Sequence, residues 1–139
     1  MPDYAGDLSA RDAWEMLGRE GEAVLVDVRT RPEWQFVGVP DLDRLGKRPL
    51  FISWQNYPGM ERNDAFVAQV TGAGVGPDAP LLFLCRSGGR SRAAAAAMTA
   101  AGFRRCYNVA GGFEGGLDAA RHRGTGEGWK AAGLPWIQE

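Results

Sequence analysis

The candidate nucleophile of the chain is Cys85, which opens a short glycine-rich loop between an apolar run and an alanine-rich segment. Alanine is the strongest helix former, so the loop is expected to end in a helix start. Paired glycines permit a tight turn, and the helix start adds unpaired amide protons and the positive end of the helix dipole. Because the thiolate is the reactive form of cysteine, these amide protons and the basic neighbours predict an activated sulfur nucleophile. The loop consists of Cys85, Arg86, Ser87, Gly88, Gly89, Arg90 and Ser91.

The second cysteine and the single histidine lie in less reactive surroundings. Cys106 begins a strand-like run with no glycine loop behind it, so we expect it to pack in the core, with a resolving thiol as the open alternative. His122 lies in a basic segment flanked by glycine, and a Cys-His hydrolase would have to use this one residue. Groups so widely separated do not suit a zinc site, and no Gly-Lys-Ser/Thr follows the loop to make a P-loop. We therefore expect no bound metal and no nucleotide.

Apolar runs that alternate with helix-like segments must position the loop. Buried strands are expected at 23–28, 50–54, 80–85 and 106–109, and helices at 63–71, at 90–101 and from a Ser9 cap to about Glu20. A short helix is also expected at 115–120, and a last helical turn at 129–132. This alternation predicts an α/β fold with a mostly parallel central sheet and helices on both faces. Ligands bind such sheets at the carboxyl ends of the strands, where Cys85 lies.

Length and charge narrow the class of protein. The 139 residues fit a single domain, residues 1–139, and the content of 45% hydrophobic and 24% charged residues is that of an ordinary globular chain. With 16 basic and 17 acidic residues the net charge is −1, which argues against a nucleic-acid or membrane-surface binder. No apolar run approaches the ~20 residues of a membrane span, and the acidic N-terminus lacks a signal-peptide pattern. Two cysteines are too few for the disulfide framework that is typical of small secreted domains, so we expect a reducing compartment, the cytoplasm.

Four ordered motifs resemble the rhodanese family over nearly the whole chain. The resemblance implies a rhodanese-like fold for a single-domain sulfurtransferase. One departure is clear, because the family usually has Gly-His-Ile-Pro-Gly-Ala where residues 38–43 read Gly-Val-Pro-Asp-Leu-Asp, without the histidine. That departure concerns the local loop and the pocket rim, not the cysteine loop. The motifs are Asp27-Val28-Arg29 with Glu33-Trp34, the Cys85 loop, Gly102-Phe103 with residues 107–113, and Trp129 with Gly133-Leu134-Pro135.

The activity implied by the resemblance is that of a thiosulfate sulfurtransferase working through a persulfide on Cys85. The cysteine would take the outer sulfur of a small anionic donor such as thiosulfate and pass it to a thiol or protein acceptor, without a cofactor. Backbone N–H groups of residues 86–91 would stabilise the persulfide, and Arg86 and Arg90 would attract the donor.

Supporting residues are expected around this loop. Asp27 or Glu33 would hold one loop arginine in place, and Arg29 belongs to the same motif as a supporting residue. The sequence does not tell which of the two acids forms the pair. Three tryptophans are candidates for the pocket wall, although core or rim packing is the commoner role of such rings: Trp34, Trp129 and Trp136.

Two other functions stay open at this point. A cysteine-based phosphatase or arsenate reductase of related fold also uses a cysteine in an anion loop that ends in arginine. Those loops are longer than the four residues that separate Cys85 from Arg90, and Arg92 lies too far along the chain. The shorter loop should fit a sulfur-sized group better than a tetrahedral phosphate. The other alternative is a non-catalytic rhodanese-like binding module, against which the intact Cys85 and its basic loop argue.

Overall fold

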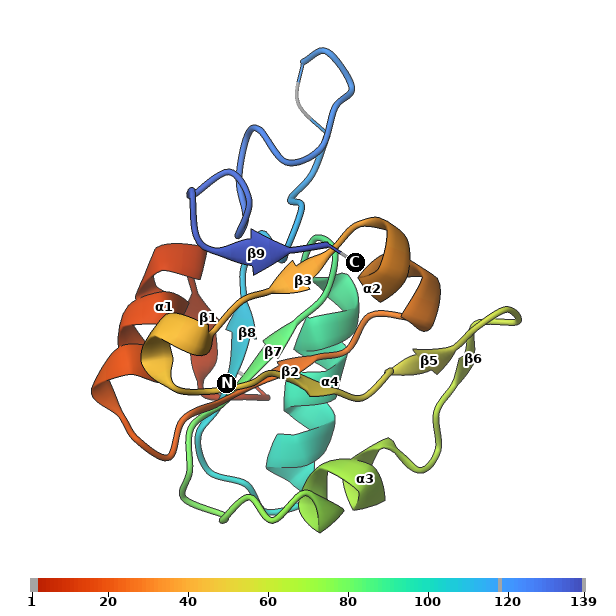
Figure 1. Ribbon diagram of the computed structural model, residues 1–139. Coiled ribbons are helices and arrows are strands. Elements are labelled where there is room, and N and C mark those ends of the chain that lie inside the picture. The colour runs from red at the N-terminus through yellow and green to blue at the C-terminus, as the bar shows by residue number, and fades with distance from the viewer. Residues whose placement is uncertain (1–2, 118, 139) are drawn as a thin grey trace.

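A five-stranded sheet forms the centre of the computed structural model, which describes residues 3–117 and 119–138 (Figure 1). The strand order is β1-β8-β7-β2-β4, and every neighbouring pair is parallel. The predicted α/β class with a parallel central sheet is therefore confirmed. The strands are β1 Gly6–Leu8, β2 Val24–Asp27, β4 Leu50–Phe51, β7 Leu81–Leu84 and β8 Cys106–Val109.

Helices cover both faces of this sheet, as the alternating pattern predicted (Figure 1). Residues of α1 share one apolar cluster with the sheet, and residues of α3 and α4 share the other. Within the described ranges, no helix is long and apolar enough to cross a bilayer. The helices are α1 Ala10–Arg19, α2 Arg31–Phe36, α3 Phe66–Gly72 and α4 Gly89–Ala100, with a 3-10 turn, η1, at Asp43–Leu45.

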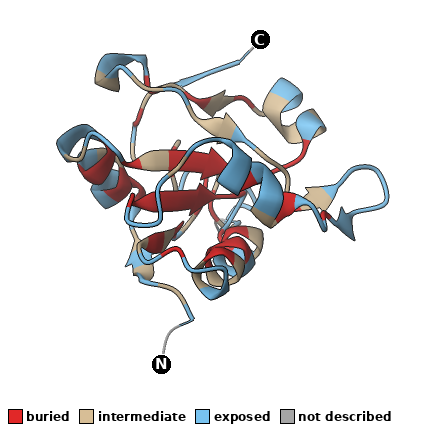
Figure 2. Ribbon diagram, turned by 90° about the horizontal axis from the view of Figure 1, so that it is seen from below, coloured by how far each residue is buried: buried red, intermediate tan, exposed pale blue. Residues whose placement is uncertain are grey.

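Successive residues of β7 enter opposite cores, which explains its unbroken apolar sequence. Leu82 and Leu84 belong to the cluster packed on α1, whereas Leu81 and Phe83 belong to the cluster packed on α3 and α4. All four side chains are buried, and the central strands are red in Figure 2. A strand covered on both faces needs apolar residues at every position.

Two short antiparallel pairs lie beside the main sheet. β3 (Val39–Pro40) pairs with β9 (Trp136–Ile137), which brings the C-terminal segment against the part of the chain where the family histidine is missing. β5 (Gln55–Asn56) and β6 (Glu61–Arg62) form a separate hairpin. These pairs of two residues each are too short to produce a periodic signal in the sequence.

Side-chain contacts explain where three elements begin or end. Ser9 caps α1 as expected, since its hydroxyl accepts the Asp12 N–H at 3.1 Å. The strand predicted at 50–54 ends at Phe51, and Trp54 instead packs edge-on against Phe66 with ring centres 5.1 Å apart. The helix predicted from Asn63 begins at Phe66, because the Asn63 side chain accepts the Ala65 N–H at 3.1 Å in a turn.

The helix predicted at 115–120 was wrong for the described part of that segment. Gly115 adopts φ of 74°, a left-handed conformation that cannot continue a right-handed helix, and its N–H donates to the Arg86 carbonyl at 3.1 Å. Residue 118 lies outside the described residues. Residues 129–132 form the single turn that the sequence predicted, with the Ala132 N–H donating to the carbonyl of Gly128, four residues earlier, at 3.0 Å.

Candidate active site

Cys85 lies directly after the carboxyl end of β7 and shortly before the first turn of α4. The intervening loop turns sharply because Gly88 adopts φ of 121°, a conformation that a side chain would strain. Cys85 exposes only 1% of its surface and packs beside the apolar cluster of α3 and α4. The cysteine therefore sits at the base of the loop rather than on its rim.

Two hydrogen-bonding groups face the sulfur of Cys85. The Gly88 backbone N–H donates to Sγ at 3.1 Å, and the Ser91 hydroxyl lies 3.2 Å from Sγ. The sequence predicted that backbone N–H groups of residues 86–91 surround the sulfur. Among the described hydrogen bonds, the Gly88 N–H is the one of these that donates to Sγ. Donors of this kind favour negative charge on the sulfur. Three other loop residues are exposed around the site: Arg86, Ser87 and Gly89.

Glu33 on α2 is the acid that contacts a loop arginine. Its two carboxylate oxygens accept from Nη1 and Nη2 of Arg90 at 2.7 and 2.9 Å, in a mostly buried fork. One of these oxygens also accepts the Thr30 N–H at 3.2 Å and the Thr30 hydroxyl at 3.0 Å, so the same group caps α2. Burial acts to raise the pKa of Glu33, but the contacts with Arg90 and Thr30 outweigh it and lower that pKa to about 2.

Asp27, the other candidate, binds Arg29 instead. Nε and Nη2 of Arg29 donate to the two Asp27 oxygens at 2.9 and 2.7 Å, and both residues are completely buried. Nη2 also reaches the Gly38 carbonyl at 2.8 Å, and the guanidinium carbon lies 4.3 Å from the ring centre of Phe113. This pair links the end of β2 to the turn that supports the cysteine loop.

A second glycine turn, residues 110–115, braces the backbone of the cysteine loop. The Phe113 N–H donates to the Cys85 carbonyl at 2.8 Å, and the Glu114 N–H donates to the Arg86 carbonyl at 3.0 Å. Gly112 has φ of 61° and approaches so closely that a Cβ there would lie 2.6 Å from the Arg86 carbonyl carbon. The Gly-Gly pair was the available signal, because adjacent glycines mark a turn or a close backbone approach.

Ser91 belongs to a buried chain of polar groups that did not stand out in the sequence. Its hydroxyl lies 2.5 Å from Oδ1 of Asn108, and Nδ2 of Asn108 donates to Asp7 at 2.9 Å. The same Asp7 oxygen accepts the Tyr4 hydroxyl at 3.0 Å. Ser91 and Asn108 are completely buried, whereas Asp7 is exposed. An asparagine within a buried strand was the available signal, since a buried amide needs partners.

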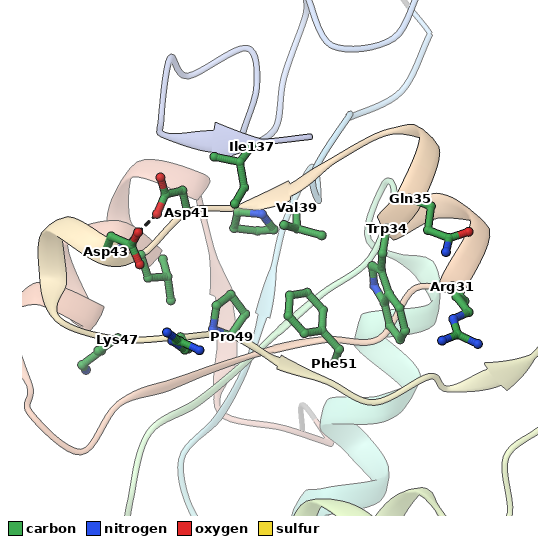
Figure 3. A pocket seen from close by; sticks show the side chains of 13 residues that line it. Arg31, Trp34, Gln35, Val39, Asp41, Asp43, Lys47, Pro49, Phe51 and Ile137 are labelled. Atoms are coloured by element: carbon green, nitrogen blue, oxygen red, sulfur yellow. Dashed lines mark hydrogen bonds between the residues drawn. The ribbon is translucent and has the colours of Figure 1, made fainter. Parts of the chain in front are cut away.

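A separate cleft of about 580 Å³ opens between α2, the segment from β3 through η1, and β4 (Figure 3). Trp34 and Phe51 meet edge to face there with ring centres 5.3 Å apart, and Val39 and Ile137 extend the apolar wall. Among the described residues that line it, none comes from the cysteine loop. The segment that departs from the family pattern therefore shapes this cleft and not the surroundings of Sγ.

The three tryptophans considered for a pocket wall have different positions. Trp34 lines the cleft just described. Trp129 is a core residue, completely buried, and its indole N–H donates to the Pro135 carbonyl at 2.7 Å. Trp136 lies on β9 and packs edge-on against Phe113, with ring centres 6.2 Å apart.

Cys106 begins β8, at the opposite edge of the sheet from Cys85. The thiol is buried and lies 3.8 Å from the Phe103 carbonyl, to which it donates. Burial raises the pKa of the Cys106 thiol. Both cysteines are free thiols. Over residues 3–117 and 119–138, no three His, Cys, Asp or Glu side chains gather in a way that would hold a metal ion.

A family model described as STR4 middle domain matches residues 5–139. The chain belongs to the STR4 middle domain family. Similar sequences include uncharacterized proteins of Rickettsia rickettsii and Rickettsia prowazekii, which are 42% and 38% identical to this chain. Each alignment runs over 130 residues and covers 94% of this chain and 95% of the relative. The chloroplastic rhodanese-like domain-containing protein 4 of Arabidopsis thaliana is 26% identical over 138 residues, which is 99% of this chain and 27% of that protein.

Solved structures resemble this STR4 middle domain protein along its length. The crystal structure of Rv0390 from M. tuberculosis is 50% identical, with a TM-score of 0.89 over 98% of this chain and 99% of that one. The polysulfide-sulfur transferase homodimer of Wolinella succinogenes is 21% identical, with a TM-score of 0.64 over 99% of this chain and 80% of that one. The fold of the STR4 middle domain protein is rhodanese-like, as the sequence motifs implied.

Proposed function

We propose that the protein is a sulfurtransferase that carries a transferable sulfur atom on Cys85 as a persulfide. The observation that carries the proposal is the surroundings of Sγ, to which the Gly88 N–H donates at 3.1 Å and toward which the Ser91 hydroxyl, 3.2 Å away, can turn when the sulfur is an anion. The thiolate is the nucleophilic form of cysteine, and donors at these two positions would stabilise a sulfur anion. The rhodanese-like name of the Arabidopsis relative supports the same chemistry. In the expected location, a reducing cytoplasm, both cysteines would stay free thiols.

The reaction consists of two displacements at sulfur. In the first, the Cys85 thiolate attacks the outer sulfur of thiosulfate, a new S–S bond forms, and sulfite leaves with the electron pair of the broken S–S bond. In the second, a thiophilic acceptor attacks that outer sulfur, and the electron pair of the Cys85 S–S bond returns to Sγ. Cyanide is the acceptor in an assay, and a small thiol or protein thiol is the acceptor in cells.

The donor is expected to be a small anion that presents a terminal sulfur. Because Cys85 exposes only 1% of its surface, the loop admits a narrow group more readily than a bulky one. Arg90, which the sequence suggested as an attracting cation, is neutralised by Glu33 and serves mainly to hold the loop. Arg86 is exposed and forms no ion pair among the described residues, so it is the loop cation that we assign to the donor.

Sulfur transfer is favoured over the phosphatase or arsenate reductase alternative. Hydrolysis of a tetrahedral anion needs the loop arginine to bind that anion. Both Nη atoms of Arg90 are instead occupied by the Glu33 carboxylate at 2.7 and 2.9 Å. The four residues between Cys85 and Arg90 also enclose less space than the longer loops of those enzymes.

Thiosulfate–cyanide turnover tests the proposal. We expect wild type to form thiocyanate, Cys85→Ala to form none, and Cys106→Ala, the matched control, to keep its activity. Hydrolysis of a phosphate ester without thiocyanate formation would indicate the phosphatase and contradict the proposal. No turnover with any sulfane donor, together with full cellular function of Cys85→Ser, would indicate a non-catalytic binding module instead.

A further inference from the structure

We propose that Asn108 and Asp7 are positioning residues that set how readily Cys85 ionises, because Oδ1 of Asn108, held in place by Asp7, competes with the sulfur for the hydrogen bond of the Ser91 hydroxyl. The inference rests on the proposed function in that Cys85 is taken as the attacking sulfur. Neither Asn108 nor Asp7 forms a described hydrogen bond to Sγ, so both act through Ser91.

The Ser91 hydroxyl has a single proton and three acceptors within reach. Oδ1 of Asn108 lies 2.5 Å away, whereas Sγ of Cys85 and the Gly88 carbonyl each lie 3.2 Å away. The usual O–H···O distance is about 2.7–2.8 Å, so the contact with Asn108 is the strongest of the three. In the resting state the Ser91 hydroxyl therefore donates its hydrogen bond to Oδ1 of Asn108, and a lone pair of Ser91 Oγ is left to accept the S–H of the Cys85 thiol.

Asp7 determines which side of the Asn108 amide faces Ser91. A carboxylate only accepts hydrogen bonds, so the amide nitrogen must face Asp7, and the amide oxygen faces Ser91. The Tyr4 hydroxyl donates to the same Asp7 oxygen at 3.0 Å and helps to hold the carboxylate. An exposed carboxylate thus controls a completely buried hydroxyl through one amide group.

Ionisation of Cys85 requires the Ser91 hydroxyl to change its acceptor. The thiol proton leaves Sγ for water or a buffer base, and the Ser91 O–H rotates from Oδ1 of Asn108 toward the sulfur anion. The S–H bond is the only bond to hydrogen that breaks, and the O–H bond of Ser91 stays intact. Because Oδ1 of Asn108 is then left buried without that donor, Asn108 opposes ionisation, while Ser91 favours it.

Other charged groups also act on the sulfur and must stay in place during the test. Arg90 is close enough to Cys85 for their charges to interact, and Glu33 neutralises it. Arg29 neutralises Asp27 in the same manner. The charged or titratable groups on the elements around the loop are Asp27 at the end of β2, Arg29 after it, Glu33 on α2, Arg86, Arg90 and Arg92 on the loop and α4, Glu114 on the glycine turn, and Tyr4 with Asp7 at β1.

Two substitutions that act in opposite directions test the inference. The measurement is the pH profile of iodoacetamide alkylation, followed by mass spectrometry of the peptide that contains Cys85. We expect Asn108→Leu to move the midpoint of the profile down by about 0.5–1 pH unit, since Ser91 is freed to donate to sulfur. Ser91→Ala should move the midpoint up by a similar amount. A merely structural role would lower the stability of both variants without shifting their midpoints in opposite directions.

The surface variant Asp7→Asn decides the question if Asn108→Leu does not fold. Its neutral side chain lets the Asn108 amide turn, so the midpoint should also move down. The shift should persist at about 0.5 M salt, where a simple change of surface charge is screened. Asp78→Asn is the matched control, because Asp78 is an exposed acid that precedes β7 at the opposite edge, and it should leave the midpoint unchanged.

The outcomes separate this inference from the proposed function. Coincident midpoints for wild type, Asp7→Asn and Asn108→Leu would overturn the inference, and thiocyanate formation by wild type would still support sulfur transfer. Midpoints that shift as expected, in a wild-type protein that transfers no sulfur, would uphold the hydroxyl switch and contradict the proposed function.

Discussion

The carboxyl ends and the amino ends of the parallel strands form two opposite edges of the sheet, and each edge holds a buried free cysteine. The two thiols differ in their main hydrogen-bond partners. At the carboxyl edge, Cys85 faces the Gly88 N–H and the Ser91 hydroxyl. At the amino edge, Cys106 donates to the Phe103 carbonyl. Exposure does not distinguish them, because both are buried. The Gly88 N–H and the Ser91 hydroxyl can stabilise a sulfur anion at Cys85, whereas burial raises the pKa of Cys106 and outweighs its contact with the Thr99 hydroxyl.

The same two edges also carry arginine–carboxylate pairs of different character. Arg29 and Asp27, beside the cysteine loop, are completely buried. Arg105 and Glu20, next to Cys106, form an equally well-aligned fork, but 38% and 27% of their side chains are exposed. Charges removed from water are costly to separate, so a buried pair fixes backbone geometry in a way that an exposed pair does not. The fully buried pair thus lies where the cysteine loop must be held in place.

The largest effect is expected from breaking the buried pair. Arg29→Met leaves Asp27 buried and without its partner, and should lower the free energy of unfolding by about 3–5 kcal/mol. The matched variant Arg105→Met removes an exposed partner and should leave the urea midpoint nearly unchanged. If urea unfolding shows the same loss of unfolding free energy in both variants, the two arginine–carboxylate pairs do not differ as described.

Two glycines with similar backbone conformations test the donor at the sulfur. Gly88 and Gly102 have φ of 121° and 107°, and a Cβ at either would meet no atom closer than 3.8 Å. Alanine should therefore cost both positions a similar stability, about 1–2 kcal/mol. The rate of sulfur transfer should fall by up to roughly 100-fold in Gly88→Ala and stay unchanged in Gly102→Ala, because alanine keeps the N–H but relaxes from the strained φ of 121°, which turns that N–H away from Sγ. Equal kcat/KM values in the two variants would contradict the role of the amide.

Acid should weaken the contact between α2 and the cysteine loop. The pKa of Glu33 in the folded protein is about 2, below its ordinary value of 4.5, so its contribution to stability is complete above that ordinary value. The contribution should disappear as the pH falls from about 4.5 to 2, because the unfolded chain then binds the proton more readily. Wild type should exceed Glu33→Gln by on the order of 2–3 kcal/mol at pH 7. Urea unfolding measures both stabilities, and a difference between wild type and Glu33→Gln that stays the same from pH 7 to pH 2 would contradict the role given to Glu33.

The smallest effect is expected at Cys106. Cys106→Ala removes one buried sulfur and should cost about 1 kcal/mol of stability, with sulfur transfer unchanged. Thermal unfolding and thiocyanate formation measure the two quantities on the same sample. A large loss of transfer in a folded variant would show that Cys106 is a resolving thiol rather than a core residue.

Much of the sheet could be predicted from sequence because buried strands have continuous apolar runs. The runs around β2, β7 and β8 and the alanine-rich α4 were located to within a few residues of their ends. The short α2 was not located, although Thr30 and Glu33 have the spacing of a capping box that begins a helix. The expectation that residues 1–139 make a single domain stays a prediction.

The cysteine loop could also be placed from sequence, but its partners could not. The local sequence pattern, a strand end followed by glycines and a helix start, was enough to predict where Cys85 lies. Which acid reached Arg90 depended on how α2 packs against α4, and no local pattern encodes that distance. The chain from Ser91 through Asn108 to Asp7 joins residues up to 101 positions apart, so it depends on the pairing of β1 with β8 and on the packing of α4 against β8.

The most direct measurement of the central claim is the mass of each cysteine peptide after the protein has been incubated with thiosulfate. The peptide that contains Cys85 should gain one sulfur atom, lose it again on addition of cyanide, and leave the Cys106 peptide unchanged. Absence of any gain on Cys85, or a gain on Cys106 that persists in Cys85→Ala, would contradict the assignment of Cys85 as the sulfur carrier.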